Sequence, residues 1–196
     1  RVFVWKDGAK EVDTVMTPRD SILYYKRFLR AGLLSLTPQT GEVKAWVGGI
    51  NYKHFQYDHV KTGRRQVGST FKPFLYATAI DQLHLSPCDT VPDIPYCIPA
   101  GDMGAQEDWC PENSSEGFKG MITLKSALAN SINTVSARLM HRVGPQPVIN
   151  LIDKLGVDTE NIPAVPSIAL GTPDLSLFEM VSAYSAFANK GVHVEP

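Results

Sequence analysis

The sequence lacks the features of several broad protein classes. No apolar run approaches the roughly 18 residues that cross a bilayer, and the chain opens on the strand-like residues 1–5 rather than on a signal peptide. Its 19 basic and 20 acidic side chains are scattered and leave a net charge of −1, which is unlike a nucleic-acid binder or a polybasic membrane patch. We expect no nucleic-acid partner, and any export signal must lie outside these residues.

Cysteine is scarce, with Cys88, Cys97 and Cys110 only. The spacing contains no CxxC pair and the five histidines form no ligand cluster, so no metal site is expected. Two interpretations of the cysteines remain open. They are three buried or half-buried thiols, or Cys97 and Cys110 form one disulfide in an oxidising compartment.

What is present is typical of one soluble globular domain: 196 residues, of which 43% are hydrophobic and 20% charged. Turn signals predict a hairpin at 31–50 and a long Pro- and Gly-rich irregular loop at 86–118. The period of the hydrophobic residues predicts a helix at 69–83 and, after the loop, further helices at 124–130, 134–143, 147–155 and 176–190. Within the hairpin, alternation of Val43, Ala45 and Val47 with polar neighbours predicts one packed face. The order indicates an α+β fold, an antiparallel sheet with packed helices and a helical subdomain.

Ser69 and Lys72 stand three residues apart where the 69–83 helix is expected to start. Both side chains would lie on one face and could meet. A lysine whose pKa is lowered by desolvation can activate a serine hydroxyl, and helix N-terminal N–H groups suit a developing oxyanion. An isolated S-x-x-K occurs by chance in many proteins, and by itself it favours a helix-start serine with a surface lysine over a catalytic pair.

Ser131 and Asn133 lie between two predicted helical segments. On a continuous helix, positions i and i+2 point to nearly opposite sides, so the chain must break here if both are to face one cleft. The alternative is an ordinary helix cap, and the two roles are compatible.

S-x-x-K followed by an S-D-N-type motif is a known signature of penicillin-binding proteins and serine β-lactamases. The segment 68–74, Gly-Ser-Thr-Phe-Lys-Pro-Phe, closely resembles the nucleophile motif of class A penicillin-binding proteins. Residues 109–113 resemble their W-x-P-x-N segment, residues 123–133 their second motif, and residues 166–171 and 187–191 the stretch that follows. The resemblance covers the chain from about Ala31 to its end.

The resemblance implies a DD-transpeptidase that cross-links peptidoglycan stem peptides and is acylated by β-lactams. Ser69 would be the nucleophile, Lys72 its base and Ser131 a proton relay. Asn133 would bind the substrate amide. Trp109 and Asn113 would wall the cleft, although a loop packed against the core explains them equally well. No cofactor is implied.

The resemblance also implies parts that these residues do not contain. Class A members carry a glycosyltransferase domain and a membrane anchor on the N-terminal side, and they work on the outer, periplasmic face of the cytoplasmic membrane. The third motif, K-T-G beyond Ser131, is missing, because Lys61 to Gly63 has the letters in the wrong place. We therefore expect residues 1–196 to be one partial transpeptidase domain without its C-terminal strands, and to react poorly by themselves.

Three rival functions remain open. A serine β-lactamase needs a glutamate that activates water, for which Glu160 and Glu179 are the candidates. A β-lactam sensor would be acylated once and signal, but it normally lacks the segments at 109–113 and 166–171. A catalytically inactive structural piece is the third possibility.

Overall fold

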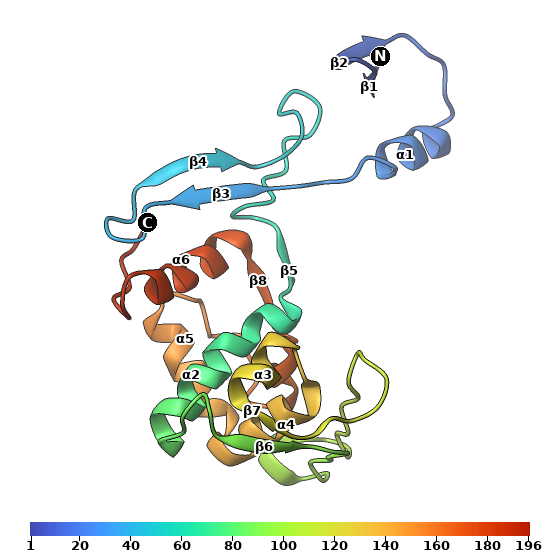
Figure 1. Cartoon of the computed structure of the whole chain (residues 1–196). Coiled ribbons are helices and arrows are strands. Elements are labelled where there is room, and N and C mark those ends of the chain that lie inside the picture. The colour runs from blue at the N-terminus through green and yellow to red at the C-terminus, as the bar shows by residue number, and fades with distance from the viewer.

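The computed structural model describes residues 1–196. Helices and short strands alternate along the chain (Figure 1). The strands are β1 Val2–Trp5, β2 Ala9–Val12, β3 Leu33–Leu36, β4 Val43–Val47, β5 Arg64–Gln66, β6 Thr90–Asp93, β7 Gly120–Thr123 and β8 Asp174–Ser176. The α-helices are α1 Pro18–Lys26, α2 Lys72–Leu83, α3 Leu124–Ala129, α4 Asn133–Val143, α5 Pro145–Lys154 and α6 Leu177–Ala188, with 3-10 turns at Gly68–Phe71, Asp102–Gly104 and Pro166–Leu170. The predicted α+β class is confirmed.

The core lies among α2, α4, α5 and α6 (Figure 1). Helix α2 packs against both α4 and α5, and its Phe74 and Leu75 are fully buried. Val135 and Leu139 of α4 meet them from the other side. The segment 68–74 thus leads into a helix that is packed into the core, and packing fixes the position of its first turn.

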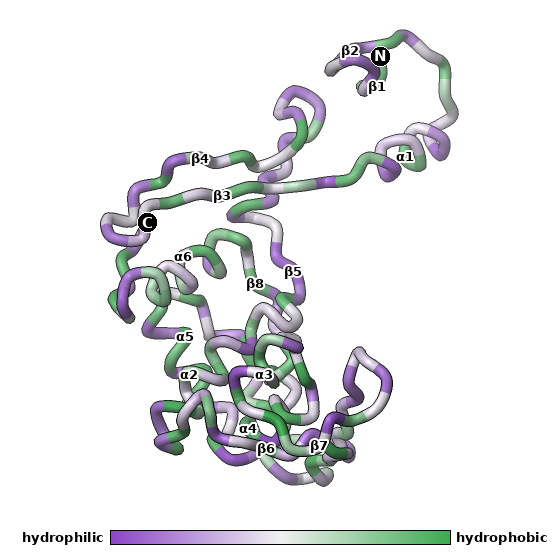
Figure 2. Tube along the Cα trace, viewed as in Figure 1, coloured by the Kyte–Doolittle hydropathy of each residue, from purple (hydrophilic) through white to green (hydrophobic).

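The strands form four separate antiparallel pairs, β1–β2, β3–β4, β5–β8 and β6–β7, rather than one continuous sheet. The predicted hairpin at 31–50 is confirmed as β3–β4, and hydrophobic and hydrophilic residues alternate along β4 (Figure 2). The prediction of its packed face was wrong, because Val43 and Val47 are 38% and 49% exposed. Trp46 lies over Phe178 of α6 instead, with ring centroids 5.8 Å apart.

The segment 86–118 is more regular than expected. Its start pairs with the residues after it, as β6 with β7, and an isolated bridge joins Ile98 to Trp109. Cys97 and Cys110 form a disulfide beside that bridge, and both residues are exposed. The disulfide interpretation is therefore confirmed and the buried-thiol one is wrong; Cys88 is free and exposed.

The helices follow their start and stop signals. The first turn of the predicted 69–83 helix is 3-10, after which α2 begins at Lys72 with Pro73 at a position where no N–H is needed. Helix α5 begins at Pro145, two residues earlier than predicted. Thr123 caps α3, and Ser176 with Glu179 forms the predicted capping box of α6.

The N-terminal residues lie apart from the helical body (Figure 1). Helix α1, which the sequence analysis missed, has a signal in Thr17, whose side chain accepts from the Asp20 N–H, and in Pro18 at its first position. Phe3 of β1 packs at 5.2 Å from Phe28 and 5.3 Å from the ring of Phe55. No helix in the chain has the length and apolar character that crossing a membrane demands.

Candidate active site

Ser69 lies in the 3-10 turn that leads into α2. Gly68 takes a φ of +58°, a region that glycine enters without strain, and its N–H donates to the Gly171 carbonyl at 2.9 Å. The preceding Val67 N–H donates to the Pro173 carbonyl at 3.2 Å. These bonds fix the turn from the side of residues 171–173 and leave Ser69 itself exposed.

Lys72 is 1% exposed and reaches the second motif. Its ammonium donates to the Ser131 carbonyl at 2.7 Å, to Ser131 Oγ at 3.0 Å and to Asn133 Oδ1 at 2.6 Å. Burial lowers the pKa of Lys72 to about 8. At pH 7 about a tenth of the molecules would then carry a neutral amine, the form that accepts a proton. Ser69 and Lys72 stand at positions i and i+3 of a 3-10 turn and therefore share one of its faces. The three hydrogen bonds of the Lys72 ammonium nevertheless go to the second motif and not to Ser69.

The break predicted between Ser131 and Asn133 is present. Helix α3 ends at Ala129, Ser131 adopts a φ of +54°, and α4 begins at Asn133. Positive φ is rare for a serine, and here it turns the chain so that both side chains face Lys72. Lys72, Ser131 and Asn133 therefore form one hydrogen-bonded cluster, and Ser69 lies in the 3-10 turn that leads into Lys72.

Asn113 supports this cluster from behind. Its Oδ1 accepts from the N–H groups of Asn133 and Thr134, at 2.9 and 3.3 Å, so it binds the free N–H groups at the start of α4. Its Nδ2 donates to Asp93 Oδ1 at 2.8 Å. The amide is engaged within the protein, and its expected substrate contact stays a prediction.

Trp109 is half-buried and packs against the hydrophobic core. It also lines a cleft of about 630 Å³ with Ser167 and the Glu107–Asp108 pair. Ser69, Lys72, Ser131 and Asn133 do not line this cleft, so the structure supports the packed-loop interpretation and does not test the cleft-wall one. Its contact with substrate stays a prediction.

Asp93 at the end of β6 was missed by the sequence analysis. Its side chain is fully buried and accepts from Thr134 Oγ1 at 2.6 Å, Lys119 N at 2.8 Å and Asn113 Nδ2. Burial alone would raise the pKa of Asp93, but these hydrogen bonds outweigh it and the pKa is lowered. One carboxylate thus joins β6, the 113–119 loop and α4.

Replacing Asp93 with asparagine should destabilise the domain by about 1–3 kcal/mol at pH 7, since buried donors lose their acceptor. The lowered pKa means that the carboxylate stabilises the fold above its unfolded pKa of about 4, and that this contribution disappears as pH falls through the folded pKa. The gap between the variant and the wild type should therefore narrow in acid. The measurement is the temperature at which the full-length protein, heated at each pH from 7 down to 4 and then assayed at pH 7, loses penicillin labelling. The exposed Asp81, changed to asparagine, is the control; a gap that stays constant with pH would contradict the prediction.

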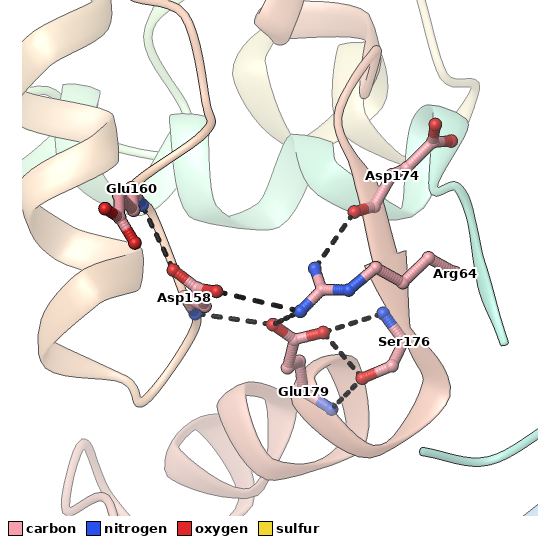
Figure 3. A network of polar contacts seen from close by, with 6 residues as sticks. All are labelled: Arg64, Asp158, Glu160, Asp174, Ser176 and Glu179. Atoms are coloured by element: carbon pink, nitrogen blue, oxygen red, sulfur yellow. Dashed lines mark hydrogen bonds and ion pairs between the residues drawn. The ribbon is translucent and has the colours of Figure 1, made fainter. Parts of the chain in front are cut away.

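A second polar network lies at the start of α6 (Figure 3). Glu179 Oε2 accepts from Ser176 N at 2.8 Å and Ser176 Oγ at 2.6 Å. Its Oε1 accepts from Arg64 Nη2 at 3.2 Å and from the Asp158 N–H at 3.3 Å. Of the two glutamates considered for water activation, Glu179 therefore has both oxygens occupied by protein donors, and Glu160 is exposed.

No three His, Cys, Asp or Glu side chains gather where they could hold a metal ion. The expectation that the reaction needs no metal or cofactor stays a prediction.

The comparisons with known proteins agree with this geometry. Residues 32–196 match the penicillin-binding protein transpeptidase domain, and residues 1–29 match the penicillin-binding protein middle domain. The assignment of all 196 residues to one domain stays a prediction.

Two relatives are both named penicillin-binding protein 1A. That of Pseudomonas aeruginosa is 35% identical over 85% of this chain and 20% of its own length, and that of Aquifex aeolicus 36% identical over 86% and 22%. The crystal structure of penicillin-binding protein 1A from Haemophilus influenzae superposes with a TM-score of 0.79 at 29% identity, covering 85% of this chain and 24% of that one. The chain spans about a fifth of the length of these relatives, and by its match over residues 32–196 it belongs to the penicillin-binding protein transpeptidase family.

Proposed function

We propose that the full-length protein is a peptidoglycan DD-transpeptidase and that Ser69 is its acylated nucleophile. The observation that carries the proposal is the buried Lys72, whose ammonium is held against Ser131 and Asn133 one 3-10 turn from Ser69. The family and its named relatives support the reaction class.

In the acylation step, neutral Lys72 takes the proton of the Ser69 hydroxyl as Oγ attacks the penultimate D-alanine carbonyl of a stem peptide. The bond to the terminal D-alanine breaks, and its amine leaves with a proton delivered through Ser131. The Ser69 N–H supplies half of the oxyanion hole. Asn133 Oδ1 accepts from Lys72 and its Nδ2 donates to the Glu112 carbonyl at 2.7 Å, so the second N–H of the Nδ2 group is the part of the amide that binds the substrate. An amine from a neighbouring stem then attacks the ester and restores Ser69.

β-Lactams would acylate the same hydroxyl, with opening of the ring and no loss of atoms. A β-lactamase would also require a carboxylate to activate water against the ester. Glu179 is committed to four protein donors, which disfavours that alternative. We further propose that the protein acts on the outer face of the cytoplasmic membrane, anchored through a segment that precedes these residues.

Intact-mass analysis of the full-length protein after incubation with penicillin tests the proposal. We expect a gain equal to one whole antibiotic molecule, and no gain in Ser69→Ala. Ser115→Ala, at an exposed serine of the 113–119 loop, is the control and should gain the same adduct as the wild type. An adduct that survives in Ser69→Ala, or the absence of any adduct on the wild type, would overturn the assignment.

A further inference from the structure

Glu179 is a buried carboxylate that the proposed reaction does not use. It is 8% exposed, and its two oxygens have different partners (Figure 3). Oε2 completes the capping box with Ser176, whereas Oε1 faces Arg64 and the backbone of Asp158. A capping box requires only an acceptor at this position, which glutamine also provides. The ion pair with Arg64, in contrast, requires the negative charge of a carboxylate.

Arg64 transmits this contact to the strand before the nucleophile. It lies on β5, and besides Glu179 it bonds the Asp174 carbonyl through Nη1 at 3.4 Å. Strand β5 pairs with β8 in the register Arg64 to Ser176, Arg65 to Leu175 and Gln66 to Asp174. The guanidinium therefore holds the far end of a three-residue strand whose near end leads into the turn that carries Ser69.

The same series of bonds continues beyond β5. The Val67 N–H reaches the Pro173 carbonyl and the Gly68 N–H reaches the Gly171 carbonyl. Every residue from 64 to 68 is thus bonded or paired with residues 171–176. A displacement of β5 against β8 would move the backbone of Ser69 directly, with no loop between them to absorb it.

Helix α6 contacts the nucleophile turn a second time. Tyr184, less than two turns after Glu179, donates its hydroxyl to the Thr70 carbonyl at 2.5 Å. The first turn of α6 thus contacts β5, the strand that precedes Ser69, and the second half of α6 bonds Thr70, the residue that follows Ser69. Both sides of the nucleophile are therefore positioned by contacts with α6.

We propose that Glu179 is a positioning residue for Ser69, acting through its ion pair with Arg64 and the β5–β8 pairing. The inference rests on the proposed function, because it assigns Glu179 a part in the acylation of Ser69. Misplacement of a nucleophile by about 1 Å can cost on the order of a hundredfold in rate. Arg64 also contacts the exposed Asp158 carboxylate at 3.8 Å, but its shorter contact, at 3.2 Å, is with the buried Glu179, so loss of the Glu179 charge is sufficient to shift a strand of three residues.

The test compares Glu179→Gln with the wild type in the full-length protein, by stopped-flow acylation with a fluorescent penicillin. Glutamine keeps an acceptor for Ser176 but loses the nearer of the two carboxylate charges that face Arg64, and the charge of Asp158 remains. We expect the acylation rate constant to fall about tenfold to a hundredfold, with the dissociation constant of the preceding non-covalent complex changed by less than about twofold. General loosening of the fold would instead weaken both quantities.

Asp20→Asn is the matched control. Asp20 forms the equivalent contact with Thr17 at the start of α1, where Thr17 Oγ1 donates to Asp20 Oδ2 at 2.7 Å, but this cap lies in the N-terminal region away from Ser69 (Figure 1). The chemical change is the same, and acylation should stay at the wild-type rate.

Arg64→Gln keeps the inference falsifiable if Glu179→Gln does not fold, because the Arg64 side chain is 47% exposed and tolerates replacement. It should slow acylation similarly, and the double variant should be no slower than the slower single one. Wild-type acylation rates in Glu179→Gln or Arg64→Gln would overturn the positioning role and leave the proposed function standing. A wild-type protein that is not acylated at Ser69 would overturn both.

Discussion

Replacing Lys72 with methionine should lower the rate of Ser69 acylation by about a hundredfold to ten-thousandfold, the usual contribution of a general base. Methionine fills a similar buried volume but cannot accept the serine proton. It also releases the Ser131 carbonyl and hydroxyl that Lys72 holds at 2.7 and 3.0 Å. The measurement is the second-order rate constant for penicillin acylation of the full-length protein. Lys125→Met, at an exposed lysine on α3, is the control and should react normally.

The pH dependence of the wild type provides a second check on Lys72. Because burial lowers the pKa of Lys72 to about 8, the neutral base becomes more abundant as pH rises from 6 to 9. The acylation rate should increase about tenfold per pH unit well below pH 8 and level off above it. An acylation rate that falls as pH rises through this range would show that the charged form of Lys72 is the active one and would refute its role as base.

Replacing Gly171 with alanine should cost both stability and acylation. Gly171 has a φ of +73°, and a Cβ added there would lie 1.9 Å from the Gly68 carbonyl oxygen. Backbone strain of about 1–3 kcal/mol adds to overpacking of about 1–3 kcal/mol, since the obstacle is backbone that cannot rotate away. Relief of the clash would separate residues 171 and 68, which moves the turn that carries Ser69. We expect an acylation rate at least about tenfold lower.

Gly117→Ala is the control that distinguishes the effect of backbone strain from the effect of the steric clash at Gly171. Gly117 has nearly the same φ, +74°, but nothing lies within 4 Å of an added Cβ. It should show only the strain of about 1–2 kcal/mol, with normal acylation. The measurements are the temperature at which penicillin labelling is lost and the rate constant at 25 °C. Equal behaviour of the two variants would mean that the contact between Gly171 and Gly68 does not matter.

Local signals predicted the single elements well. Thr123, Ser176 and Glu179 cap helices where the sequence placed them, and the hairpin at 33–47 formed around its predicted turn. Such signals succeed because a cap or tight turn depends on residues within four positions of one another. Helix α1 was missed although Thr17 and Pro18 carry the same type of signal.

Pairings between distant segments were not predictable. The packed face of β4 was assigned to its valines, but Trp46 covers Phe178, more than 130 residues away. The pairing of β5 with β8 joins residues about 110 apart, through strands of three residues that are too short to show any period. Asp93 falls in the segment predicted to be an irregular loop, and only the folded structure shows that its carboxylate accepts hydrogen bonds from Thr134, Asn113 and the Lys119 N–H.

The sequence by itself predicted which residues form the proposed site, because the spacing of Ser69 and Lys72 and the polar break at Ser131 and Asn133 are local properties of the chain. The tertiary structure alone decided how they are arranged. It buries Lys72 and lowers its pKa, turns Ser131 into positive φ against it, and aligns the Ser69 turn through Glu179 and Gly171. Desolvation and long-range hydrogen bonds arise only when segments far apart in sequence meet, which is why no local pattern encodes them.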